Sequence, residues 1–283
     1  MAVSGVLALM SQPLVFLHGA FCGGWAFDAF RAPFEAAGYR TSAPDLAGRS
    51  SSDDPDKIGR IGTKALAAQV VDQIRDLPAP PVLIGHSLGG LVAQIAATKT
   101  PVAGLVLIAP SAPWGVMPTT IEEHGSAVGL TLLGDYWRRP IPPDYGVARH
   151  ATLDRLDRDT ARATFAKFGP ESGRVVMETI QWWLDPSMAS AAPVYKIAAP
   201  VLALAGGQDR VNPASTVRRI ANRFPAGQCA YREFPEMSHW LIGEPEWEDV
   251  AHTALAWLKA KGLTADGGRK PRRGAAVEQP AGF

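Results

Sequence analysis

The chain has 283 residues, of which 47% are hydrophobic, so it is long enough to bury the core of one large domain or of a core with an insertion. Its 28 basic and 27 acidic residues leave a formal charge of +1. This balance excludes a global positive field that would hold nucleic acid or an anionic membrane, and it favours a small-molecule substrate as the partner.

Cysteine use and the N-terminal segment indicate the compartment. Two distant cysteines, Cys22 and Cys229, do not form a secreted disulfide framework, and we interpret both as free thiols. Residues 1–13 carry no basic region and only a brief apolar run, which is too little for a signal peptide or a membrane span. The sequence therefore predicts a cytoplasmic protein without a membrane segment, and no pattern in it fixes an oligomeric state.

The chain begins with residues 1–9, which are apolar but lack the turn and partner strand of a hairpin. We expect a chain that starts at Met10 to keep full activity. Six apolar runs with strand character follow at 13–19, 40–45, 81–87, 102–110, 200–207 and 229–235. Helical patterns lie between them at 24–37, 60–77, 88–99, 213–223 and 245–261. This alternation predicts an α/β fold, with a mostly parallel sheet covered by helices on both faces.

One connection breaks this rhythm. Residues 112–198 separate two predicted sheet strands and contain helical patterns, so we predict an inserted helical lid between core segments 1–111 and 199–263. The aromatic residues of the lid either pack it onto the core or line an apolar pocket. Residues 264–283 lack periodicity and are rich in Gly, Pro and charge, which predicts a disordered tail.

The sequence GHSLG at 85–89 lies between a predicted strand and a predicted helix. This pattern is typical of a nucleophile elbow, in which Gly85 and Gly89 leave room for a sharp turn that exposes the Ser87 hydroxyl. The turn places Ser87 at the N-terminus of the following helix, where free N–H groups stabilise negative charge. A Gly-rich loop with a capping serine is the structural alternative.

A serine nucleophile needs a base, and the base needs a carboxylate that fixes its tautomer. In parallel sheets such groups gather after the carboxyl ends of strands. Asp209 and His239 each follow a predicted strand, so we predict a triad of Ser87, His239 and Asp209. A simple turn-forming role for Asp209 is the alternative. We interpret His18 and His86, which lie inside motif turns, as structural or surface residues.

The loop FLHGAFCGGW, residues 16–25, follows the first predicted strand. Its glycines let the backbone approach a ligand closely. We predict that the backbone N–H groups of Ala20 and Leu88 form an oxyanion hole.

Four separated motifs in order resemble those of the α/β-hydrolase fold enzymes: HGAFCGGW for the oxyanion loop, GHSLGG for the elbow, GGQD for the acid and SHW for the histidine. The resemblance covers residues 13–261, and its first loop is most similar to the methylesterase and hydroxynitrile lyase branch. Dehalogenases and epoxide hydrolases of this fold carry aspartate at the elbow, so Ser87 argues against both. Asp45 lies in a segment similar to the loop after the second core strand, where we expect it to be structural.

The expected reaction is hydrolysis of a carboxylic ester, lactone or thioester through an acyl-enzyme, and no metal or organic cofactor is implied. The aromatic lid and the absence of a charge cluster predict a mainly apolar substrate. Candidate pocket residues are Trp25, Trp114, Trp182, Trp183 and Trp240. Trp182 and Trp183 are adjacent, so we expect at most one of them to face the pocket.

Two other functions remain open. A lyase, a carbon–carbon bond hydrolase or a cofactor-free oxygenase of this fold would use the same triad as an acid/base device. A non-enzymatic ligand sensor would bind tightly without turnover. A panel of esters with graded acyl and alcohol parts discriminates between these alternatives and ester hydrolysis.

Overall fold

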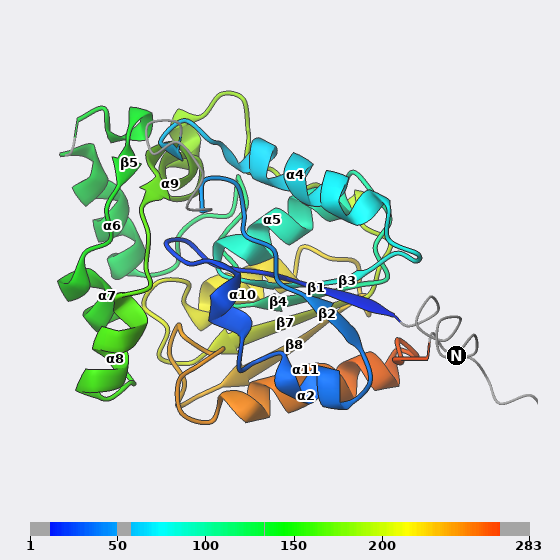
Figure 1. The fold of residues 1–283 in the computed structure, drawn as a ribbon. Helices are drawn as coiled ribbons and strands as arrows, with labels where there is room; N and C mark the ends of the chain where they lie inside the picture. Colours follow the sequence, from blue (N-terminus) through cyan, green and yellow to red (C-terminus); the bar gives the residue numbers. More distant parts are fainter. Residues whose placement is uncertain (1–11, 50–57, 133, 267–283) are drawn as a thin grey trace, which may run out of the picture.

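Six parallel strands form the central sheet of the computed structural model, which describes residues 12–49, 58–132 and 134–266. The strands lie in the order β2-β1-β3-β4-β7-β8 (Figure 1). Their bounds are Pro13–Leu17 (β1), Arg40–Ser42 (β2), Val82–His86 (β3), Gly104–Ile108 (β4), Val201–Gly206 (β7) and Cys229–Phe234 (β8). The predicted parallel sheet and its six strands are confirmed. The predictions for residues 1–9 and for 267–283 of the tail fall outside the described residues. Residues 264–266 of the predicted tail are described, and the Ala265 carbonyl accepts the Gln12 N–H at 3.3 Å.

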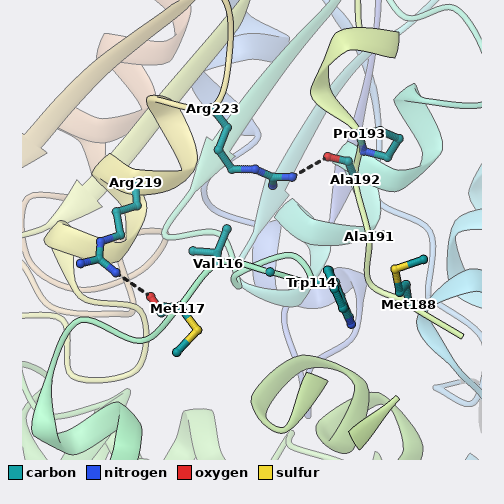
Figure 2. Close-up of a pocket in the computed structure, with 10 residues that line it drawn as sticks. Trp114, Val116, Met117, Met188, Ala191, Ala192, Pro193, Arg219 and Arg223 are labelled. Carbon is teal, nitrogen blue, oxygen red and sulfur yellow. Dashed lines mark hydrogen bonds between the residues drawn. The ribbon is translucent and has the colours of Figure 1, made fainter. Parts of the chain in front are cut away.

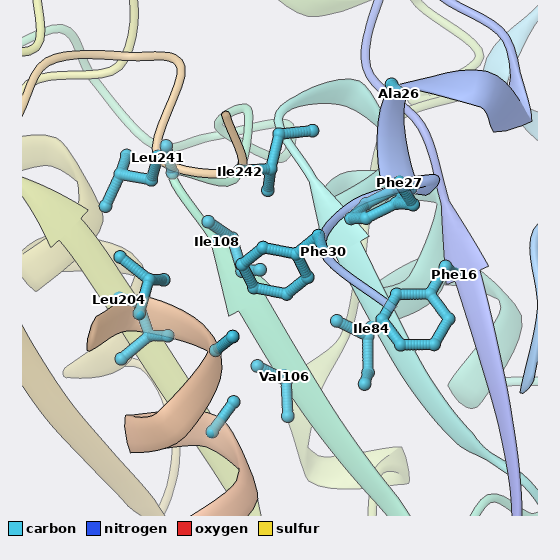
Figure 3. Packing of buried hydrophobic residues seen from close by; sticks show 14 of the residues in the cluster. Phe16, Ala26, Phe27, Phe30, Ile84, Val106, Ile108, Leu204, Leu241 and Ile242 are labelled. Atoms are coloured by element: carbon cyan, nitrogen blue, oxygen red, sulfur yellow. The ribbon is translucent and has the colours of Figure 1, made fainter. Parts of the chain in front are cut away.

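Alternate side chains of the buried strands pack into hydrophobic clusters on the two faces of the sheet. Phe16 of β1 and Ile84 of β3 pack with Phe27 and Phe30 on one face (Figure 3), which α2 (Ala32–Ala36) and α11 (Trp247–Ala260) cover. The other face is covered by three helices, α4 (Thr63–Arg75), α5 (Leu88–Ala97) and α10 (Ala214–Ala221). These layers hold the carboxyl ends of the strands at a common edge.

The helix predicted over 24–37 is two shorter elements. A 3₁₀ helix, η1, spans Gly24–Phe27, and α2 begins only at Ala32. Pro33 occupies the first turn of α2, where its missing N–H is tolerated. A proline at this position cannot continue a helix from the preceding turn, which explains the break.

The insertion between β4 and β7 is mainly helical and lies beyond the carboxyl ends of the strands (Figure 1). Its elements are α6 (Ile121–Thr131), η2 (Tyr136–Arg138), β5 (Pro140–Ile141), α7 (Tyr145–Ala151), α8 (Arg158–Phe165), β6 (Glu171–Ser172), α9 (Gly173–Ile180), η3 (Trp182–Leu184) and η4 (Val194–Lys196). A lid function for this insertion stays a prediction. Within the described ranges, no helix combines the length and apolar character that a membrane crossing requires.

Candidate active site

The turn between β3 and α5 holds Ser87 in a backbone conformation that L-residues rarely adopt, with φ 52° and ψ −120°. Its N–H donates to the carbonyl oxygen of Ile108 at 2.9 Å, which ties the turn to β4. A Cβ on Gly85 would overlap the carbonyl of Gly89, and a Cβ on Gly89 would overlap the carbonyl of Leu17. The glycines of the GHSLG sequence are therefore required by close backbone contacts, as an elbow demands.

The structure brings Ser87, His239 and Asp209 together from three strand ends. His239 Nε2 lies 3.1 Å from Ser87 Oγ, and His239 Nδ1 lies 2.9 Å from Asp209 Oδ2. The other carboxylate oxygen of Asp209 accepts the backbone N–H groups of Val211 at 2.7 Å and Asn212 at 2.8 Å. With Nδ1–H donated to Asp209, Nε2 is free to accept the serine proton. The arrangement can generate a nucleophilic serine. The predicted exposure of the Ser87 hydroxyl is not observed, because Ser87 is 5% exposed.

The loop after β1 lies against Ser87. A Cβ built on Gly19 would stand 3.2 Å from the Cβ of Ser87. Within the part of the chain that the structure describes, the N–H groups of Ala20 and Leu88 donate to no backbone or side-chain acceptor. Such free N–H groups beside a nucleophile can stabilise an oxyanion.

Two buried histidines support these loops. His18 Nδ1–H donates to the Gly19 carbonyl at 2.9 Å, and its Nε2 accepts from the Leu46 N–H at 3.0 Å. His86 Nε2–H donates to the carbonyl of His239 at 2.8 Å. Burial lowers the pKa of His18 to about 4 and that of His86 to about 3, so both stay neutral near pH 7. Both are buried and bonded to the backbone, so of the two predicted alternatives, structural or surface, the surface one is wrong.

A carboxylate that sequence reasoning missed holds the segment before His239. Both oxygens of Glu244 accept the Ser238 N–H, at 3.0 and 3.1 Å, and Oε2 lies 2.9 Å from Nε of Arg155 in the insertion. Burial raises the pKa of Glu244 to about 7, against the opposing effects of the Ser238 N–H and Arg155. Arg155 and Glu244 are 89 positions apart (244 − 155), so no local pattern could reveal the pair.

The five tryptophans proposed for a pocket fall into two groups. Trp25 and Trp240 form an aromatic cluster with Phe168 of the insertion, with ring centroids 6.1 to 6.3 Å apart. The ring of His86 lies 4.9 Å from that of His239 and 5.6 Å from that of Trp240, so this cluster adjoins the candidate triad. Trp240 itself is 4% exposed and packs in the hydrophobic core. Trp114 and Trp182 form a second group, with ring centroids 5.0 Å apart. Trp183 contacts Trp182 and is 48% exposed.

Trp114 also lines a depression of about 710 Å³ between the chain after β4, the chain before β7 and α10 (Figure 2). Met117, Met188 and Arg219 line it as well, whereas Ser87, His239 and Asp209 do not. Of the five candidate tryptophans, Trp114 alone lines this depression. In residues 12–49, 58–132 and 134–266, no group of three or more His, Cys, Asp or Glu side chains could hold a metal ion.

The fold, the elbow and the Ser–His–Asp arrangement define an α/β hydrolase, and sequence comparison agrees. Residues 14–253 match the Alpha/beta hydrolase family, and the chain belongs to this family.

Relatives of full length support this membership. The chain is 27% identical to a pyrethroid hydrolase from Sphingobium wenxiniae, over 92% of this chain and 97% of the relative. It is 28% identical to a pimeloyl-[acyl-carrier protein] methyl ester esterase from Aromatoleum aromaticum, over 84% of this chain and 95% of the relative. The crystal structure of a methylesterase from Arabidopsis superposes with a TM-score of 0.67 at 16% identity, over 88% of this chain and 99% of that chain. This last likeness concerns the fold.

Proposed function

We propose that this α/β hydrolase cleaves carboxylic esters through a covalent acyl-enzyme on Ser87. The observation that carries the proposal is the chain of contacts from Ser87 Oγ to His239 at 3.1 Å and on to Asp209 at 2.9 Å. The strained backbone of Ser87 supports it, because strain of this kind clusters at functional sites, where it is part of the mechanism. The names of the hydrolase and esterase relatives agree with this reaction.

The proposed mechanism assigns one task to each group. Ser87 Oγ attacks the ester carbonyl while His239 Nε2 takes its proton, and Asp209 stabilises the charged imidazole. The N–H groups of Ala20 and Leu88 stabilise the oxyanion of the tetrahedral intermediate. His239 then protonates the leaving alcohol. Water, activated by the same base, releases the acid and restores Ser87.

The proposed substrate is a mainly apolar ester of medium size. Trp25 and Phe168 are half-buried and share an aromatic cluster with the buried Trp240, which follows His239 in the chain. Half-buried aromatic side chains next to a site favour apolar groups. Phe168 belongs to the insertion, so the same cluster supports our proposal that residues 112–198 act as a lid over the site.

An ester panel with graded acyl and alcohol parts tests the reaction. We expect turnover of several apolar esters and a fall of at least about 1,000-fold in kcat for Ser87→Ala, because the triad acts as a unit. His239→Ala should be similarly inactive, and the double variant no worse than either single variant. A fluorophosphonate should add to the wild type at Ser87, as read by mass spectrometry of peptides.

Ser215→Ala is the matched control, because Ser215 is an exposed serine of α10. It should keep both turnover and labelling. Wild-type activity retained by Ser87→Ala would contradict the nucleophile assignment. Tight binding of esters with no turnover by the wild type would support a ligand sensor instead.

A further inference from the structure

Phe21 directly follows the proposed oxyanion donor Ala20, and its backbone is left-handed with φ 63°. A bulky residue other than glycine rarely adopts this conformation unless its surroundings impose it. The insertion binds both backbone polar groups of Phe21. Its N–H donates to Glu171 Oε2 at 3.2 Å, and its carbonyl oxygen accepts from the Gly169 N–H at 2.9 Å.

Glu171 is itself held firmly. Its side chain is fully buried, and Oε1 accepts the Ser172 N–H at 2.6 Å. The same oxygen forms an ion pair with Arg49, whose side chain is 4% exposed. Arg49 also donates from Nη1 to the Pro170 carbonyl at 2.7 Å. A buried carboxylate with a buried guanidinium partner has few alternative positions, so Glu171 is a fixed acceptor for Phe21.

The segment from Gly19 to Phe21 lies beside Ser87, the proposed nucleophile. Gly19 is in close contact with Ser87, and Ala20 and Phe21 follow it directly. When Glu171 fixes the N–H of Phe21, it fixes the peptide plane between Ala20 and Phe21. The Ala20 N–H belongs to the preceding peptide plane, between Gly19 and Ala20. Its direction therefore depends on the plane between Ala20 and Phe21, which Glu171 of the insertion anchors.

We propose that Glu171, paired with Arg49, is a positioning residue for the oxyanion hole. It keeps Phe21 left-handed, and the Ala20 N–H thereby stays aimed at the oxyanion position. This inference rests on the proposed ester hydrolysis and extends it, since it gives the insertion a role in transition-state stabilisation. The oxyanion develops only after the substrate has bound. Loss of the contact between Glu171 and the Phe21 N–H therefore lowers kcat far more than it changes KM.

The test is Glu171→Gln, measured on the best ester of the panel with rates normalised to folded protein. We expect kcat to fall at least about 10-fold while KM changes less than about two-fold. Affinity for a trifluoromethyl ketone, which forms an oxyanion on Ser87, should fall by a similar factor. Phe21→Gly in the Glu171→Gln background should recover part of kcat, because glycine adopts positive φ without support.

Glu178→Gln is the matched control. Glu178 is also a buried carboxylate of the insertion, with an Arg174 ion pair at 2.7 Å and a bond from the Thr63 N–H at 2.7 Å, but it contacts α4 instead of the oxyanion loop. It should lose stability and keep kcat within about two-fold. Should Glu171→Gln fold poorly, Glu171→Asp preserves the charge beside Arg49 and withdraws the carboxylate from Phe21, with the same expected fall in kcat.

Unchanged ketone affinity and kcat in the folded Glu171 variants would overturn the positioning role, as would equal losses in the Glu178 control. Failure of the proposed function is a different result. In that case the wild type turns over no ester, or Ser87→Ala remains active.

Discussion

At the scale of single residues, the space around each glycine shows whether a larger residue could replace it. Gly89 at the turn after Ser87 has no such space. A Cβ on Gly89 would overlap the Leu17 carbonyl and stand 2.6 Å from the His18 carbonyl oxygen, and both are backbone atoms at the end of β1. We expect Gly89→Ala to lower the free energy of unfolding by about 2 kcal/mol or more. Activity should fall strongly as well, because His18 precedes the segment that carries Ala20, our proposed oxyanion donor. Urea denaturation and kcat/KM measure the two effects.

Gly125→Ala is the control for this change. Gly125 lies inside α6, and a Cβ there would meet no atom within 4 Å. Alanine is the better helix former, so we expect a gain of about 0.5–1 kcal/mol and unchanged kinetics. Equal stability of the Gly89 and Gly125 variants would contradict the close packing at the elbow.

At the scale of elements, the insertion is fastened to the segment that carries His239. Arg155 forms ion pairs with Glu244, whose side chain is 1% exposed, and with Glu246. Arg155→Met would leave the buried Glu244 carboxylate without its cation. The Arg155 side chain is itself 24% exposed, so we expect a loss of about 2 kcal/mol, less than for a fully buried pair. Chemical denaturation provides the measurement.

Arg75→Met removes a comparable ion pair from an exposed position. Arg75 and Asp72 are 67% and 64% exposed on α4, and such pairs contribute about 0.5 kcal/mol or less. A loss as large for Arg75→Met as for Arg155→Met would show that the Glu244 pair has no special role.

At the scale of the whole molecule, three buried groups link stability to pH. His18 and His86 have folded pKa values of about 4 and about 3, below the ordinary 6.5, and Glu244 has a pKa of about 7, above the ordinary 4.5. Near pH 5.5, unfolding lets the two histidines bind protons and lets Glu244 release one. The unfolded state then holds about one proton more, so stability rises with pH by about 1.4 kcal/mol per unit between about pH 5 and 6.

Glu244→Gln removes the proton that Glu244 releases on unfolding, which offsets part of the proton uptake by His18 and His86. The net uptake on unfolding becomes about two protons, and the slope should steepen to about 2.7 kcal/mol per pH unit. Denaturation series at three pH values give both slopes. Glu236→Gln, at an exposed carboxylate two residues before Ser238, should leave the wild-type slope unchanged. A shallower slope for Glu244→Gln would contradict the sign of its linkage.

Local sequence patterns were sufficient to predict the parallel α/β fold and the three residues that meet at the candidate triad. The alternation of buried strands and amphipathic helices is a local pattern, and the GHSLG sequence at 85–89 encodes its turn within five consecutive residues. Asp209 and His239 could be found because parallel strands bring their carboxyl ends to one edge of the sheet. The break before α2 is not apparent from the helical pattern over 24–37; it lies at Pro33, in the first turn of α2.

The residues that support the candidate triad can be identified only from the folded chain. Glu171 and Phe21 are 150 positions apart, and His86 supports His239 across 153. Neither pair has a sequence signature. A glutamate such as Glu171 is usually a surface residue, and only the fold shows that this one is buried against the core. Local patterns indicate contacts between residues that are near one another in the chain. Buried polar groups also need hydrogen-bond partners, and the packing of distant segments determines which residues supply them.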